Sequence, residues 1–213
     1  MASNASSSVA AASSSRPAAA LAAGATFDVA VDLIRRLTTA RPNVPIVPMA
    51  YVNQIIGGGD GAPAARRLVD AGASGLIVAD LTPDEGREFE EITADAGLAL
   101  VYLVAPTTPA ERLHMIGSRT RGFLYCVSLV GVTGARASLA PGVGRLVRVV
   151  KSQTSVPVAV GFGVSRPAHV RALKAAGADG IIVASSLIDA LGPDGRDIAA
   201  LGRLVRALRD ATR

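Results

Sequence analysis

Three stretches of small residues near the carboxyl terminus have the composition of an anion-binding site. They are Gly131-Val-Thr-Gly134, Gly161-Phe-Gly-Val-Ser165 and Ala184-Ser-Ser186, and each ends or follows a short apolar run. Small residues at a strand end let backbone N–H groups approach an anion closely and surround it. Because three such stretches occur at successive strand ends, a phosphate site is favoured over glycines that only form turns.

A short helix is expected directly after the last of these stretches. In α/β barrels of the phosphate-binding kind, the anion commonly sits between the loops after strands seven and eight, against the N-terminus of a short extra helix. The segment 186–191, with the sequence SLIDAL, has a suitable length and composition for that helix.

Six apolar runs alternate with helical patterns from Phe27 to the carboxyl terminus. Several of the runs are continuous and rich in β-branched residues, which is typical of parallel strands covered by helices on both faces. The alternation predicts either an open doubly wound sheet or a (β/α)8 barrel. The runs span residues 44–51, 75–81, 98–106, 122–128, 157–163 and 180–186.

Two of the predicted helices begin with a capping signal. Thr82 and Thr108 each precede a proline and stand three residues before a glutamate, Glu85 and Glu111 respectively. A threonine cap, a proline in the first turn and a glutamate that bonds back to the cap stabilise a helix start. We therefore expect a helix directly after each threonine, which supports an order in which each strand is followed by a helix.

The composition predicts one soluble domain. A chain of 213 residues, half of them apolar, can bury one sizeable core, and no run approaches the ~20 apolar residues that span a bilayer. The single cysteine, Cys126, excludes an internal disulfide, fits a reducing compartment and suits core packing. We expect neither a membrane association nor a metal site, since no spacing of His, Cys, Asp or Glu is typical of metal ligands.

The first 24 residues are expected to form a disordered tail ahead of a domain over residues 25–213. They include 10 alanines and 7 serines and no acidic residue, so they offer little apolar surface to offset the entropy of ordering. Serine-rich, acid-poor N-termini also occur in transit peptides. Transit peptides are usually rich in arginine, however, and Arg16 is the only basic residue of this segment. We therefore expect the cytoplasm as the compartment, with a plastid as the alternative.

The net charge of +5 raises the question of a nucleic-acid partner. The basic residues of the carboxyl-terminal third stand singly at helical spacing, as in Arg145, Arg148 and Lys151, and only 3% of the residues are aromatic. Base stacking needs aromatic side chains, and spaced bases are typical of a solvated helix face. We expect no nucleic-acid partner.

Several stretches together resemble one known family, that of the tryptophan synthase alpha subunit. Residues 122–136, GFLYCVSLVGVTGAR, resemble its sixth strand and the following loop, and residues 157–165, PVAVGFGVS, resemble its seventh strand. Residues 75–81 and 104–109 are similar to its fourth and fifth strands. The resemblance runs from about Ala19 to the carboxyl terminus. It implies an incomplete TIM (β/α)8 barrel of about six βα units, strands three to eight, and hence an N-terminally truncated member.

The resemblance also implies an activity. The family cleaves indole-3-glycerol phosphate to indole and glyceraldehyde 3-phosphate, a retro-aldol carbon-carbon lyase step of tryptophan biosynthesis, and passes the indole to a PLP-dependent beta subunit. It implies no cofactor for this chain. By the resemblance, the phosphate site consists of Gly134, Gly163, Ala184 and Ser185, where Ala184 replaces the usual glycine. The substrate pocket would be lined by Tyr51, Leu103, Tyr125, Thr133 and Phe162.

The acid–base groups are the main departure from the family. The resemblance implies a catalytic Glu at the end of strand two and an Asp in the next loop. Both would stand before Ala19 in this chain, but residues 1–18 contain no carboxylate. Asp80, at the end of a strand, is the remaining catalytic candidate, although a role in orienting a loop at a helix start or in facing a partner subunit fits it better. His114 and His169 fall in helical patterns and are expected to be surface or packing residues.

Two alternatives to an active lyase remain open at this point. The chain could be a catalytically inactive relative that binds phosphate or a beta subunit. It could also be another phosphate-binding barrel of tryptophan, histidine or thiamine biosynthesis, although the GVTGAR stretch argues against this. If two barrel strands are missing, the first and last remaining strands have unpaired backbone groups, and the chain is expected to be less stable than its relatives.

Overall fold

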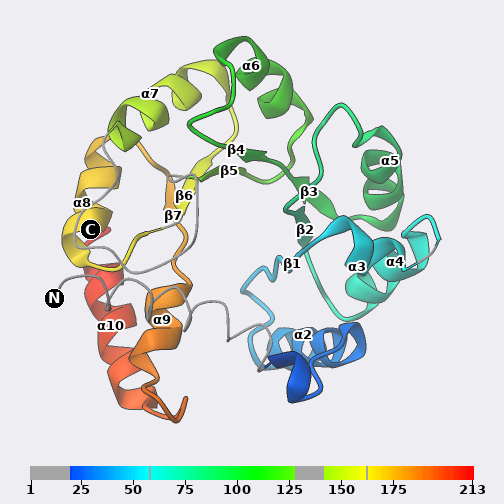
Figure 1. The fold of residues 1–213 in the computed structure, drawn as a ribbon, viewed down its shortest axis with the longest axis horizontal. Coiled ribbons are helices and arrows are strands. Elements are labelled where there is room, and N and C mark those ends of the chain that lie inside the picture. Colours follow the sequence, from blue (N-terminus) through cyan, green and yellow to red (C-terminus); the bar gives the residue numbers. More distant parts are fainter. Residues whose placement is uncertain (1–19, 58, 128–141, 162) are drawn as a thin grey trace, which may run out of the picture. The chain divides into compact units, whose positions relative to one another are not determined.

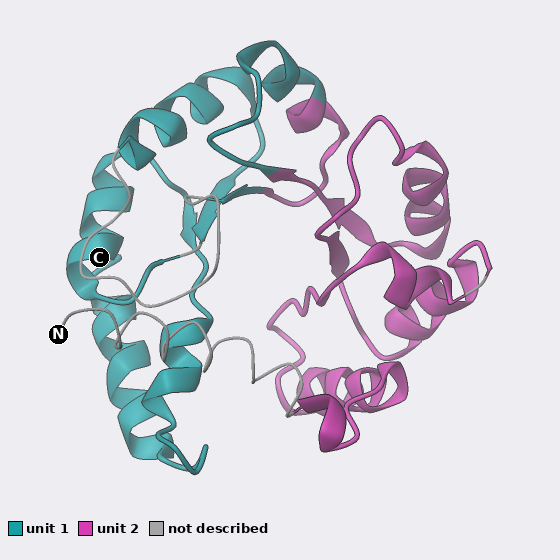
Figure 2. Cartoon of the chain, in the orientation of Figure 1, with its two compact units in different colours: residues 1–15, 104–115, 125–213 teal, residues 16–103, 116–124 magenta. Residues whose placement is uncertain are grey.

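The computed structural model describes residues 20–57, 59–127, 142–161 and 163–213, which group into two compact units (Figure 2). Among these residues, unit 2 contains the chain up to Leu103 together with residues 116–124, and unit 1 contains residues 104–115 and the chain from Tyr125 onward. The predicted division into a tail over residues 1–24 and a domain from residue 25 stays a prediction, because most of that tail lies outside the described residues.

Unit 2 is built on a three-stranded parallel sheet with the order β1-β2-β3 (Figure 1). The strands are β1 (Met49–Ala50), β2 (Gly75–Val78) and β3 (Ala99–Val101). All four residues of β2 are buried, as expected for the central strand of a sheet whose sequence is continuously apolar. The helices of this unit are α2 (Phe27–Ala40), α3 (Val52–Ile56), α4 (Ala62–Asp70) and α5 (Arg87–Ala96).

The second sheet has the order β4-β5-β6-β7, and most of its residues belong to unit 1. Its core is fully apolar, with Leu124, Cys126, Val158 and Val160 all completely buried. Burial raises the pKa of the Cys126 thiol to about 11, so the thiol stays protonated and inert, as the sequence indicated. The strands are β4 (Leu103–Val104), β5 (Leu124–Val127), β6 (Val158–Gly161) and β7 (Gly180–Ile181).

The remaining helices follow the strands of the second sheet along the chain. They are α6 (Ala110–Arg119), α7 (Val143–Gln153), α8 (Pro167–Ala175), α9 (Ser185–Ala190) and α10 (Ile198–Asp210). Arg145 and Arg148 on α7 are exposed, which confirms the solvated helix face that their spacing predicted. Among the described residues, no helix is long and apolar enough to cross a membrane.

Each of the six predicted runs contains a strand in the described part of the chain. The run 98–106 contains two short strands, β3 and β4, separated by Tyr102. The alternation of strands and helices is therefore confirmed.

One of the two predicted helix starts is wrong. After Thr82 the chain forms a turn, in which the N–H of Glu85 donates to the carbonyl of Thr82 at 3.1 Å, and α5 begins only at Arg87. Gly86 separates the turn from the helix, and an added Cβ there would overlap the hydroxyl of Tyr102. A tertiary contact that the local sequence does not encode thus delays the helix.

The second predicted helix start is correct, but its cap differs from the expected one. Helix α6 begins at Ala110, directly after the Thr108-Pro109 pair. The hydroxyl of Thr108 accepts a hydrogen bond from the N–H of Ala105 at 2.9 Å, so it points back toward the strand end. Thr108 therefore closes the loop between β4 and α6.

Candidate phosphate-binding site

Strands β6 and β7 place their carboxyl ends side by side (Figure 1). They pair in parallel with Val160 opposite Ile181, and the N–H of Ile182 continues the ladder by donating to the carbonyl of Val160 at 2.8 Å. Because parallel strands end at the same edge of a sheet, the segments that follow them leave the sheet at one place. This edge is where sites form in parallel α/β proteins.

A hydrogen bond joins these two segments just beyond the strands. The hydroxyl of Ser186, which is buried in the first turn of α9, donates to the carbonyl of Val164 at 3.2 Å. Gly163 precedes Val164 and Ser185 precedes Ser186 in the chain. Gly163 and Ser185, both predicted to bind phosphate, are therefore chain neighbours of the two residues that this hydrogen bond joins.

The backbone at these positions suits the residues found there. Gly163 has a φ of +77°, a left-handed conformation that favours glycine. Ala184, the N-cap of α9, has a φ of −133°, which lies outside the left-handed region that favours glycine. The predicted short helix is confirmed, one residue earlier than expected, and in its first turn the N–H of Leu187 donates to the carbonyl of Ala184 at 2.9 Å.

His169 supports the loop that follows β6. It is 5% exposed in the first turn of α8, and its Nδ1 accepts a hydrogen bond from the N–H of Ser165 at 3.3 Å. His169 therefore packs and positions the loop, as its helical pattern predicted. His114 lies exposed on α6, which confirms the interpretation as a surface residue.

Tyr125 of β5 packs against the end of β6. It is 5% exposed, and burial raises the pKa of its phenol to about 12, so the group is neutral at physiological pH. An added Cβ on Gly161 would come within 2.5 Å of the Tyr125 hydroxyl, so only glycine fits beside this ring without a shift. Tyr125 thus offers a neutral, rigidly held ring within unit 1.

The other predicted site residues fall elsewhere. Leu103 of β4 is half-buried, and Tyr51, directly after β1, is 57% exposed; both belong to unit 2. Thr133, Gly134 and Phe162 lie outside the described residues. Contacts of these five positions with substrate stay a prediction.

Asp80 follows β2 and caps a helix. Its Oδ1 accepts a hydrogen bond at 2.8 Å from the N–H of Val52, the first residue of α3. The interpretation that Asp80 orients a loop at a helix start therefore fits the structure, although the helix is the one that follows β1 along the chain. This bond fixes the end of β1 against the end of β2.

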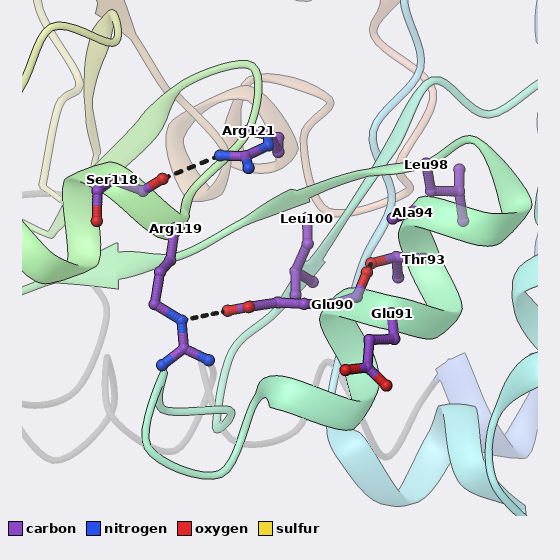
Figure 3. Close-up of a pocket in the computed structure, with 9 residues that line it drawn as sticks. All are labelled: Glu90, Glu91, Thr93, Ala94, Leu98, Leu100, Ser118, Arg119 and Arg121. Atoms are coloured by element: carbon purple, nitrogen blue, oxygen red, sulfur yellow. Dashed lines mark hydrogen bonds and ion pairs between the residues drawn. The ribbon is translucent and has the colours of Figure 1, made fainter.

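A group of charged side chains that the sequence did not reveal lines a hollow of about 260 Å³ in unit 2 (Figure 3). Glu90 of α5 accepts hydrogen bonds from the Tyr102 hydroxyl and from Nε of Arg119, both at 2.7 Å. Burial, and then the bond to Glu90, raise the pKa of Tyr102, and the same carboxylate raises the pKa of Arg119. No motif pointed to these residues, because they come from α5, from the residue between β3 and β4, and from the end of α6.

The position of this hollow indicates a structural role. Leu98 and Leu100, at the start of β3, line it together with Arg119 and Arg121 at the end of α6. Active sites of α/β barrels form at the carboxyl ends of the strands, and the opposite ends serve stability. The Glu90 network therefore holds α5 and the end of α6 to β3.

A family model described as tryptophan synthase alpha chain matches residues 12–210 of the chain. The tryptophan synthase alpha chain of Roseiflexus sp. strain RS-1 is 42% identical over 192 residues, which cover 89% of this chain and 73% of that protein. The alpha chain of Gloeobacter violaceus is 40% identical over 196 residues, 91% of this chain and 70% of that protein.

Solved structures of tryptophan synthase alpha-subunits are similar to this chain as well. A mutant tryptophan synthase alpha-subunit from Pyrococcus furiosus superposes with a TM-score of 0.81 at 35% identity, covering 90% of this chain and 76% of that one. A chain of the tryptophan synthase complex from the same organism gives a TM-score of 0.78 at 33% identity, covering 90% of this chain and 75% of that one. The predicted α/β barrel class is thereby confirmed, whereas the number of barrel units stays a prediction.

Proposed function

The chain belongs to the tryptophan synthase alpha chain family, and from that premise we propose that it binds indole-3-glycerol phosphate. The family is one of lyases that cleave this substrate to indole and glyceraldehyde 3-phosphate in tryptophan biosynthesis. The hydrogen bond between Ser186 and Val164 is the observation that carries the proposal. It supports a site in which Gly163 and Ser185 act on one phosphate group.

The phosphate would be held mainly by uncharged donors. Backbone N–H groups at Gly134, Gly163, Ala184 and Ser185, together with the Ser185 hydroxyl, supply donors of the kind that recognise phosphate at strand ends and helix starts. The indole ring would contact neutral side chains, among which the protonated Tyr125 is the best defined. Tyr51, Leu103, Thr133 and Phe162 complete the proposed lining.

Catalysis needs groups that we do not assign within this chain. The retro-aldol step requires a proton delivered to indole C3 and a proton removed from a glycerol hydroxyl. By the resemblance, the Glu and Asp for this work would precede Ala19, where residues 1–18 contain no carboxylate, and the Asp80 carboxylate is engaged with Val52. We therefore propose that these 213 residues bind the substrate and release little indole by themselves.

A PLP-dependent beta subunit is the proposed protein partner. The similar Pyrococcus furiosus chain was solved as part of a tryptophan synthase complex, which supports an equivalent assembly. We keep the cytoplasm as the proposed compartment, with a plastid as the alternative, and residue 25 as the proposed start of the folded domain.

Titration calorimetry followed by an indole assay tests the proposal. We expect saturable binding of indole-3-glycerol phosphate, with indole release at least about 100-fold slower than that of an intact relative, because acid–base groups contribute about that factor or more. Absence of binding would contradict the proposed substrate. Indole release at the rate of a relative would contradict the missing acid–base groups.

A further inference from the structure

The peptide group between Val164 and Ser165 is bonded to side chains of two different helices. Its carbonyl accepts a hydrogen bond from the Ser186 hydroxyl of α9 at 3.2 Å, and its N–H donates to Nδ1 of His169 on α8 at 3.3 Å. The C=O and N–H of a trans peptide point in opposite directions. The two side chains therefore hold this peptide from opposite sides and fix the direction of both of its polar groups. We refer to these four residues as the peptide clamp.

His169 provides a fixed anchor for one side of the peptide clamp. It is the third residue of α8, and helical side chains tilt toward the N-terminus of their helix, so its ring reaches back to the segment before the helix. Val170 and Leu173 of the same helix are buried, as is His169 itself. The packing of α8 therefore holds the ring in a constant position relative to the Ser165 N–H.

The segment that the clamp restrains begins with Gly163, a predicted phosphate-binding residue. Its φ of +77° lies in a region that glycine enters freely, and glycine restricts the backbone less than any other residue. An anion site made of backbone N–H groups depends on the orientation of each peptide beside it, because rotation of a peptide replaces a donor by a carbonyl oxygen that repels the anion. The loop after β6 therefore needs a restraint from outside its own sequence.

We propose that His169 is a positioning residue for phosphate binding. By accepting a hydrogen bond from the Ser165 N–H, it keeps the loop after β6 in the conformation that receives the anion. In this role His169 acts through the Val164–Ser165 peptide and does not touch the ligand. The inference rests on the proposed function, in which Gly163 contributes to the phosphate site.

Two substitutions distinguish a hydrogen-bond acceptor from a side chain that only fills space. His169→Asn keeps an acceptor, Oδ1, at the same number of bonds from the backbone as Nδ1, but leaves part of the ring volume empty. His169→Leu fills the site with an apolar side chain and deprives the Ser165 N–H of this acceptor. His114→Leu replaces the exposed histidine of α6 and is the matched control.

Titration calorimetry with glycerol 3-phosphate and with indole-3-glycerol phosphate measures the effect on binding. His169→Leu should weaken the binding of both compounds at least about fivefold, the effect expected from the loss of roughly one hydrogen bond. His169→Asn should bind both within about twofold of the wild type, even though the cavity that it leaves lowers the melting temperature. His114→Leu should change neither property.

Amide hydrogen exchange provides a readout that needs no ligand. Followed by NMR, exchange at the Ser165 N–H should be faster in His169→Leu than in the wild type and nearly unchanged in His169→Asn, because only the asparagine keeps the bond. Equal exchange in all three proteins would show that His169 does not restrain this peptide and would overturn the proposal.

The binding results separate the proposal from the proposed function. Loss of affinity in His169→Leu with rescue by His169→Asn supports the proposal. Equal affinity of both variants and the wild type overturns it, and so does a loss in both variants that follows their melting temperatures. If the wild type binds glycerol 3-phosphate with the expected pattern but does not bind indole-3-glycerol phosphate, the positioning role stands and the proposed substrate fails. If the wild type binds neither compound, both fail.

Discussion

Two regions of the molecule use polar groups in contrasting ways. In unit 2, the charged groups of Glu90 and Arg119 satisfy each other and the Tyr102 hydroxyl between α5 and the end of α6. In unit 1, the carboxyl ends of β6 and β7 carry small residues and are joined by one neutral hydrogen bond, from Ser186 to Val164. The first region therefore stabilises the fold, and the second leaves backbone donors for a ligand.

We therefore expect the Glu90 network to contribute to stability and the ends of β6 and β7 to contribute to ligand binding, and substitutions in each region can test this. Substitutions in the Glu90 network should lower stability and leave anion binding unchanged. Substitutions at the ends of β6 and β7 should weaken ligand binding even where they lower the free energy of unfolding only slightly.

The largest effect is expected for Glu90→Ala. It removes the partner of both Tyr102 and Arg119, whose ion pair with Glu90 is only about a quarter exposed, and should lower the free energy of unfolding by about 2–3 kcal/mol. Thermal melts should show a fall of roughly 5–10 °C. Glu91→Ala is the control, because Glu91 is exposed and its ion pair with Arg87 spans 3.9 Å; it should change stability by less than about 0.5 kcal/mol.

Gly161→Ala should have the next largest effect, about 2 kcal/mol of lost stability. The added methyl group would press on the Tyr125 ring, and overpacking of this kind commonly costs about 1–3 kcal/mol. Chemical denaturation measures the loss. Gly202→Ala on α10 meets only the flexible end of Arg206 and should be neutral or stabilising, so an equal loss at both glycines would show that the Tyr125 contact is not the cause.

Ser186→Ala should lower stability by about 1 kcal/mol, the usual contribution of one buried hydrogen bond. It should also weaken the binding of indole-3-glycerol phosphate severalfold, because the segments after β6 and β7 lose their connection. Ser152→Ala removes an exposed hydroxyl that bonds to Val149 and should alter neither property. An unchanged affinity of Ser186→Ala for indole-3-glycerol phosphate would show that the hydrogen bond to Val164 does not maintain the phosphate site.

The smallest effect concerns acid and Asp179. Burial alone would raise the pKa of Asp179, but hydrogen bonds from Lys151 and from the N–H of Val158 outweigh it and lower the pKa below its usual value. Its contribution to stability is thus complete above the unfolded pKa of about 4 and disappears as the pH falls through the lower folded value. Asp179→Asn should cost about 0.5 kcal/mol at pH 7 and nothing near pH 2, as melts at both pH values would show.

The sequence predicted the features that depend on local composition. Continuous β-branched runs located the strands, and the small residues after them located Gly163 and Ser185. The helix start after Thr82 was wrong because the packing of Tyr102 against Gly86 joins residues that are distant in the chain. The Glu90 network was missed for the same reason. The general roles of His169 and Asp80 were predicted, but their partners, the N–H groups of Ser165 and Val52, were not, since no local pattern marks them.

The affinity of Ser185→Glu for indole-3-glycerol phosphate tests the central claim most directly. Titration calorimetry on the wild type, on this variant and on the control Ser155→Glu compares a charge placed at the proposed phosphate site with one at an exposed loop position. Repulsion between the new carboxylate and the phosphate should weaken binding at least about tenfold in Ser185→Glu and leave the control near the wild type. Equal affinity in all three proteins would contradict the assignment of the phosphate to the ends of β6 and β7.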